Sequence, residues 1–158
     1  FIVLLLILAE NNQTVMDKDG LLIRNYISNE AGIGDNEASV LTLLRYKDFS
    51  MLFTGDSGVD TFMKLKNYLP QNITVLKVGH HGANGVVNKE MLEYLNPKYA
   101  LISTGINKFG HPTIYTVAML RDRTILRTDI NNSIRFVVND KGYNTFVFDT
   151  KKKKYIAK

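Results

Sequence analysis

The chain has 158 residues, long enough for one domain with a sizeable hydrophobic core. Hydrophobic residues make up 45% of it and charged residues 22%, a composition typical of globular proteins that excludes a disordered or collagen-like chain. The net charge of +5 permits contact with phosphate-bearing partners without proving it, and the absence of cysteine excludes disulfides and thiolate metal sites.

The first eight residues, FIVLLLIL, are all apolar. A membrane-spanning helix needs about 20 such residues, and polar residues begin here at Glu10. The basic leader and small-residue cleavage site of a signal peptide are not visible. We therefore expect a buried strand and no membrane span in this chain, with the end of a truncated membrane helix as the alternative.

Short apolar runs separated by Gly, Asn, Asp and Pro predict eight further strands. They are expected at 21–27, 39–46, 51–55, 73–79, 99–104, 124–128, 133–139 and 143–149. Apolar residues at helical spacing predict helices at 59–69, 88–95 and 112–120. Without an internal repeat or a linker, this pattern predicts one α/β unit.

The predicted helices have recognisable ends and faces. The inward faces are expected to consist of Val59, Phe62, Met63, Lys66 and Leu69; Met91, Leu92 and Leu95; and Ile114, Val117 and Ala118. Asn88 is expected to cap the second helix, and Pro112 suits the first turn of the third. The four-lysine run at 151–154 is expected in a solvated, flexible tail at 151–158, with a specific phosphate-binding patch as the alternative.

Three predicted strands are followed by residues that can bind metals or transfer protons. Asp56 follows the first, His80 and His81 follow the second, and His111 lies beyond the third. Each alone is typical of a helix cap or a surface turn. Because the carboxyl ends of strands in α/β folds meet on one rim, the three together predict a shared site. Carboxylate oxygen and imidazole nitrogen suit Zn²⁺, Mn²⁺ or Fe, so metal-assisted hydrolysis is the hypothesis.

Five stretches of the sequence occur in an order typical of one protein family. They are DNEASVLTLLRY, MLFTGD, ITVLKVGHHGANG, NPKYALISTG and NKFGHP. With this order and spacing, the sequence resembles the C-terminal half of the metallo-β-lactamase-fold domain of ComEC-type competence proteins and their soluble relatives. The resemblance covers about residues 35 to 137. It implies an αββα sandwich with two divalent ions, Zn or Mn, at one edge, and a single partial domain over 1–158.

The resemblance also implies roles for individual residues. Asp56 would be the carboxylate that bridges the ions, and either His80 or His81 would be a ligand. His80 directly follows the strand and is the better anchored, so we favour His80 as the ligand, with His81 either holding a ligand or contacting the substrate.

Two further motifs are expected to line the same site. Asn36 and Ser39 match the family's N-x-x-S stretch, and Asn107 matches the start of N-x-x-G-H-P. His111, in the same motif, is expected to contact the substrate or assist proton transfer. Ala83 departs from the family, which commonly has serine after HHG.

The family's principal metal-binding loop, H-x-[HD]-x-D-H, does not occur in this sequence. Only three histidines exist, and all follow residue 79. The site is therefore expected to be incomplete in this chain. Either the chain is the C-terminal portion of a larger protein, or it is a degenerate, non-catalytic version. We expect the former, because the sequence starts abruptly without methionine.

For the intact parent, the resemblance implies a metal-dependent hydrolase of phosphodiester bonds that acts on nucleic acid during DNA uptake. A ComEC-type parent can carry membrane-spanning segments, with this domain outside the cytoplasm of a bacterial cell; otherwise the protein would be soluble. One alternative is a stand-alone metallo-hydrolase of another phosphoester or an ester. Another is a non-catalytic module that binds nucleic acid or a partner through the lysine tail and Lys77, Lys108, Arg121 and Arg123.

Overall fold

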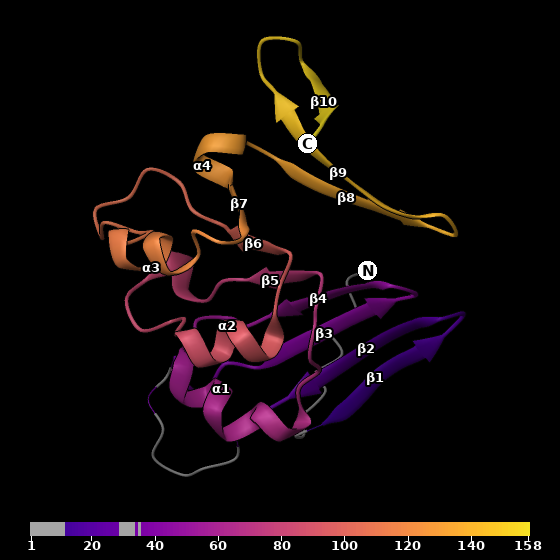
Figure 1. The fold of residues 1–158 in the computed structure, drawn as a ribbon, viewed down its shortest axis with the longest axis vertical. Coiled ribbons are helices and arrows are strands. Elements are labelled where there is room, and N and C mark those ends of the chain that lie inside the picture. Colours follow the sequence, from indigo (N-terminus) through magenta and orange to yellow (C-terminus); the bar gives the residue numbers. More distant parts are fainter. Residues whose placement is uncertain (1–11, 29–33, 35) are drawn as a thin grey trace, which may run out of the picture.

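The computed structural model describes residues 12–28, 34 and 36–158 (Figure 1). The strand expected at FIVLLLIL lies outside these residues. The strands are β1 (Gln13–Lys18), β2 (Leu21–Tyr26), β3 (Leu41–Tyr46), β4 (Phe49–Phe53), β5 (Val75–Lys77), β6 (Tyr99–Ile102), β7 (Thr124–Arg127), β8 (Ile134–Asn139), β9 (Gly142–Asp149) and β10 (Lys154–Ala157). The helices are α1 (Val59–Leu65), α2 (Lys89–Leu95), α3 (Ile114–Met119) and α4 (Thr128–Asn131), with short 3₁₀ segments η1 (Lys66–Tyr68) and η2 (His80–Gly82).

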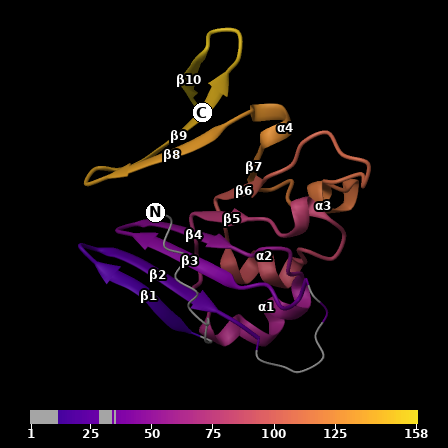
Figure 2. The ribbon, with the colours of Figure 1, turned by 180° about the vertical axis from the view of Figure 1, so that it is seen from behind.

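The strands form two sheets, and the larger one changes character at its centre. Its order is β1 to β7, antiparallel from β1 to β4 and parallel from β4 to β7. Tight turns join the antiparallel pairs β1–β2 and β3–β4, whereas parallel neighbours need long crossovers such as those after β4, β5 and β6. β8, β9 and β10 form a separate antiparallel sheet, seen beside the larger sheet in both opposite views (Figure 1, Figure 2).

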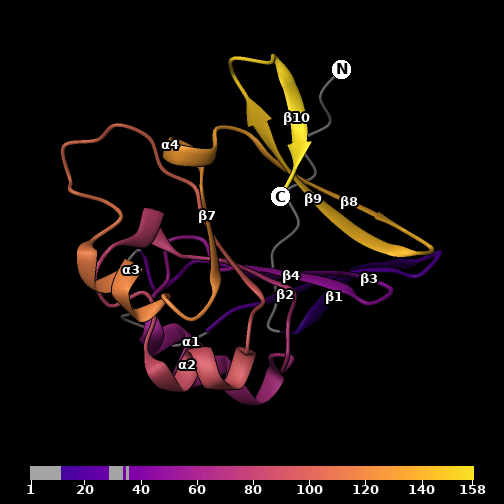
Figure 3. The same ribbon diagram turned by 45° about the horizontal axis from the view of Figure 1, so that its top comes forward.

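Both faces of the seven-stranded sheet are covered by apolar side chains. On one face, Leu76 packs in a cluster with Phe62 of α1 and Leu95 of α2. Its neighbour Val75 belongs to the cluster on the other face, where Phe136 of the small sheet packs. Consecutive strand residues point to opposite faces, so β5 contributes to both clusters. The result is a layer of helices, a large sheet and a small sheet (Figure 3).

Most predicted elements are confirmed, but two helix faces are wrong in part. Met91, Leu92 and Leu95 are buried as expected, and the Asn88 side chain accepts a hydrogen bond from the Met91 amide at 2.8 Å. In α1, Met63 is 43% exposed and Leu65 is buried in its place.

In α3 the prediction fails more clearly. The helix begins at Ile114, after the cap Thr113, so Pro112 lies outside it. Ile114 is 78% exposed, whereas Thr116 and Leu120 are buried. The buried face of α3 therefore differs from the predicted one, because the preceding loop sets the orientation of the helix against the core.

The lysine run is not a free tail. Lys151–Lys153 lie in the turn after β9, and the residues of β10 pair with β9, with Tyr155 opposite Phe148. The Phe148 and Tyr155 rings lie 5.4 Å apart, centre to centre. The four lysines remain exposed, so the run is solvated as expected but held by the hairpin.

Candidate functional site

The three loops that follow β4, β5 and β6 meet at one edge of the large sheet. The His80 amide donates to the Gly55 carbonyl at 3.1 Å, which joins the first loop to the second. His81 Nδ1 lies 2.7 Å from the carbonyl oxygen of Ser103, which joins the second loop to the third. The rings of His80 and His111 lie 5.4 Å apart, centre to centre. The structure therefore brings the predicted carboxylate loop and all three histidines together.

Asp56 is held by the segment that precedes β3. Its amide donates to Ser39 Oγ at 3.1 Å. At Gly55, where φ is +56°, an added Cβ would come within 2.8 Å of Ser39 Cβ. The close approach of Ser39 requires glycine here, and it fixes the backbone from which the half-buried Asp56 side chain projects.

Lys77, the last residue of β5, interacts electrostatically with Asp56. Its ammonium donates to the Val78 carbonyl at 3.0 Å. Burial lowers the pKa of Lys77 from its ordinary value, and the negative charge of Asp56 opposes this in part. A half-buried positive charge thus acts on the carboxylate of Asp56.

The histidine pair occupies a strained turn. His80 and His81 have φ of +43° and +53°, values that cost energy for residues other than glycine. They are followed by Gly82 at φ +83°, where a Cβ would lie 2.6 Å from Pro112 Cβ. The turn is kept in this shape by its neighbours, and strain of this kind is concentrated at functional sites.

The two imidazoles have different hydrogen-bond partners. A carbonyl oxygen only accepts, so His81 Nδ1 donates to Ser103, and Nε2 of the neutral ring keeps its lone pair. His80 Nδ1 lies 3.3 Å from Asn36 Nδ2, which donates, so His80 Nε2 carries the proton when that ring is neutral. The second assignment depends on the orientation of the Asn36 amide.

Asn107 organises the loop between β6 and α3 from within. Its Oδ1 accepts from the amides of Phe109 at 3.0 Å and His111 at 3.1 Å, and its Nδ2 donates to the His111 carbonyl at 2.7 Å. The same Nδ2 lies 2.9 Å from the Gly105 carbonyl. The Asn107 side chain is thus directed at its own loop, while the half-buried His111 lies beside His80.

Glu37 is a site-supporting residue that sequence reasoning missed. Its carboxylate accepts from the amides of Gly58 and Thr61, both at 3.1 Å, and also from the Thr61 hydroxyl. Because Gly58 has no side chain to cap α1, Glu37 performs this role from a distant segment. The segment 36–39, which we term the clamp, therefore contacts His80, the start of α1 and Asp56 through three of its residues.

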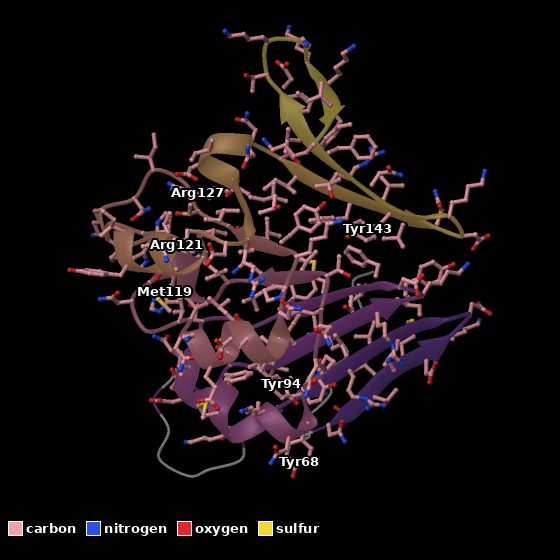
Figure 4. All side chains as sticks on the ribbon, in the orientation of Figure 1. Tyr68, Tyr94, Met119, Arg121, Arg127 and Tyr143 are labelled. Carbon is pink, nitrogen blue, oxygen red and sulfur yellow. The ribbon has the colours of Figure 1, made fainter. Side chains whose placement is uncertain are left out.

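A separate groove lies between α2 and α3, away from the histidines. It is lined by Leu92, Tyr115 and Met119 with several charged side chains, and Met119 and Arg121 mark its α3 side (Figure 4). None of the residues predicted for the metal site lines it, whereas Arg121 and Arg123, expected to bind nucleic acid or a partner in the non-catalytic alternative, both do. Among the described residues, moreover, no group of three or more His, Asp or Glu side chains is arranged to hold a metal ion.

Comparison with known proteins places this arrangement in a family context. No family model matches the sequence. The chain is 34% identical over 105 residues to ComE operon protein 3 of Bacillus subtilis (strain 168), covering 64% of this chain and 14% of that protein. It is 31% identical over 114 residues to competence protein ComA of Neisseria gonorrhoeae, covering 69% of this chain and 16% of that protein. The chain thus spans a small part of the curated relatives it matches.

Among solved structures, the CmlA beta-hydroxylase E377D mutant matches 75% of this chain and 31% of its own, with a TM-score of 0.50 and 12% identity. At that identity the likeness concerns the fold alone. The α/β architecture is of the metallo-β-lactamase type, as the sequence predicted. Within that class, this chain is related to the ComEC-type competence proteins.

Proposed function

We propose that this chain forms part of a metal-dependent site that hydrolyses phosphodiester bonds, with nucleic acid as the substrate. The observation that carries the proposal is the meeting of Asp56, His80, His81 and His111 at one strand edge in a relative of competence proteins. The net charge of +5 suits a polyanionic substrate.

The residues present supply part of a metal site and do not complete one. Asp56 and one histidine of the pair are the donors, and the described residues hold no group of three ligands. We propose that further ligands come from outside the described residues, as from the family's H-x-[HD]-x-D-H loop. Divalent ions, when bound, would supply an activated water and polarise the phosphoryl group.

The hydrogen bonds favour His81 over His80 as the metal-binding histidine. A ligand imidazole needs a free lone pair on one nitrogen and commonly donates from the other to a carbonyl or carboxylate. His81 meets both conditions through Ser103. His80, preferred from the sequence, meets them only with the Asn36 amide reversed, so that Asn36 accepts from Nδ1.

The remaining residues would act on the substrate or on their neighbours. His111 is placed to donate a hydrogen bond to a phosphoryl oxygen or to move a proton, because its ring lies beside His80. Asn36 and Ser39 would orient His80 and Asp56. Asn107, expected to contact substrate, would act instead by holding the backbone around His111.

A second function is favoured by the lack of a three-ligand group among the described residues. In this alternative the chain is a non-catalytic module that binds nucleic acid without cleaving it.

No helix in the described part of the chain is long and apolar enough to cross a membrane. Within a ComEC-type protein, we propose that this region lies outside the cytoplasm of the bacterial cell.

The experiment that separates the two functions is a metal titration combined with a cleavage assay. The chain is titrated with Mn²⁺ and, separately, Zn²⁺ by calorimetry, with Asp56→Asn as the isosteric variant. Labelled oligonucleotides are then incubated with each metal. Metal binding that disappears in Asp56→Asn, with cleavage that follows the same variant, supports the hydrolase. Oligonucleotide binding with no metal uptake excludes hydrolysis by this chain on its own and favours the binding module.

A further inference from the structure

The loop between β6 and α3, residues 103–113, projects from the body of the molecule (Figure 1, Figure 3). Two of its apolar side chains are turned to solvent: Phe109 is 70% exposed, and Ile106 is fully exposed. Single exposed apolar residues are common on protein surfaces, so exposure alone does not make this a binding site. The case for a binding role rests on the ordered backbone around Phe109 and on the side chains that surround its ring.

The exposure of Phe109 is built into an ordered backbone. Asn107 accepts from the Phe109 amide and binds both the amide and the carbonyl of His111. Thr104 Oγ1 also donates to the His111 carbonyl, at 3.3 Å. The loop therefore holds the Phe109 ring outward without that ring contributing to the core.

The ring is placed between a cation and the candidate site. Lys108 Nζ lies 5.6 Å from the centre of the Phe109 ring. The Phe109 and His111 rings lie 6.0 Å apart with 30° between their planes, and His111 is the neighbour of His80. A flat apolar surface, a positive charge and the histidines thus follow one another over a short distance.

The formal charges of the loop are of one sign, because residues 103–113 include Lys108 and no Asp or Glu. An acidic partner is therefore complementary to the loop, and a ligand that combines a flat apolar face with phosphate fits it best. A nucleotide has both parts.

We propose that Phe109 is a nucleobase-stacking residue, and that the site consequently receives a single strand or an unpaired end. A base within a duplex already has neighbours on both faces, so only an unpaired base can stack on a protein ring. Lys108 then contacts a phosphate of the same strand. The inference rests on the proposed function, because it specifies the form of the nucleic-acid substrate.

The test measures binding in the absence of metal, so that it is independent of hydrolysis. The full chain is titrated against a labelled single-stranded oligonucleotide, an otherwise identical strand with abasic positions, and the corresponding duplex, all in EDTA at low salt. Phe109→Ala is expected to weaken single-strand binding about 5- to 150-fold, the range for loss of one stacked base. Phe109→Trp is expected to retain it, and duplex binding is expected to change little.

The matched control is Tyr68→Ala, which removes another exposed aromatic ring, 52% exposed, from η1. It should bind the single strand as the wild type does. On the wild-type chain, the abasic strand should bind as weakly as the normal strand binds Phe109→Ala. Equal single-strand affinity in wild type and Phe109→Ala, an equal loss for strand and duplex, or no single-strand affinity in the wild type would each overturn the proposal. If the chain passes this test but cleaves no oligonucleotide with Mn²⁺, the proposed role of Phe109 stands and the proposed hydrolysis is rejected.

Discussion

The two halves of the candidate site are held in place by opposite means. Asp56 and His80 are fixed from outside, by the clamp at 36–39, which reaches across from the segment before β3. The loop of 103–113 is fixed from inside, by the side chain of Asn107. The first half therefore depends on distant parts of the fold, whereas the ends of the loop are tied to Gly82 and Thr128 and its middle, with Phe109 and His111, is held locally by Asn107.

The largest expected effect is a loss of stability on replacing Gly82 by alanine, compared with the same replacement at two glycines of the 103–113 loop. Gly82→Ala forces a Cβ to within 2.6 Å of Pro112 Cβ at a φ of +83°. We expect a loss of about 3 kcal/mol in the free energy of unfolding, from overpacking and backbone strain together. Urea denaturation measures it.

Two loop glycines serve as the internal controls. Gly110 has a φ of +73° but open space around it, so Gly110→Ala should cost only the backbone strain, about 1 kcal/mol. Gly105 has open space and no positive φ, so Gly105→Ala should change stability by less than about 0.5 kcal/mol. Equal losses at all three positions would contradict the contrast.

The next prediction breaks the external support alone. Glu37→Gln replaces an oxygen that accepts from Thr61 by an amide group that cannot accept, and should cost about 1–2 kcal/mol. Hydrogen exchange is expected to accelerate at the amide of Asp56, which donates to Ser39 of the clamp, and at the amide of His80, which donates to the carbonyl of Gly55 beside Asp56.

Asn88→Ala is the matched control for Glu37→Gln, because it removes the cap of α2 on the same face of the sheet. It should cost about 1 kcal/mol without selectively accelerating exchange at Asp56 or His80. If both variants gave the same exchange pattern, Glu37 would be a helix cap and nothing more.

Breaking the internal support should produce the complementary pattern. Asn107→Ala removes bonds to the amides of Phe109 and His111 and to the His111 carbonyl. We expect a cost of about 1 kcal/mol, because the loop is exposed and water can replace part of what is lost. Exchange should accelerate at Phe109 and His111 and stay unchanged at Asp56. Acceleration at Asp56 would show that the two halves are coupled.

The smallest effect concerns Lys77. Its pKa is lowered in the folded chain from the ordinary 10.5 by burial, so between the two values the unfolded chain binds more protons than the native one. Stability should therefore rise with pH as the native ammonium deprotonates, until pH passes the unfolded value. Urea denaturation across alkaline pH is expected to show a shallower rise for Lys77→Met. An unchanged slope would assign the pH dependence to other groups.

The sequence was sufficient for elements whose signals are local. Strands with apolar alternation, such as β3 and β4, were predicted, and Asn88 was recognised as a cap because the capping residue adjoins its helix. β1 was missed because its residues are mostly polar and exposed, with the strand held by pairing to β2. β10 was missed for a related reason, since the lysine run that leads into it resembles a solvated tail.

The site was predictable only in part for the same reason. Convergence of the strand ends followed from parallel topology, so the meeting of Asp56 with the histidines could be expected. Glu37 could not, because the helix that it caps begins more than twenty residues later, and sequence rules for caps look only at adjacent positions. Its place inside the N-x-x-S stretch was the one available signal.

The change from antiparallel to parallel pairing at β4 also bears on how the site is assembled in time. The meander from β1 to β4 joins strands that adjoin in sequence, and such local pairings close quickly. The pairings of β4 with β5 and of β5 with β6 each require a whole crossover to close first. Asp56 and the histidines occupy three successive crossovers, so a chain with only its meander formed would have a sheet and no site. Formation of the His80–His111 contact would thus be a marker of the last stage of folding.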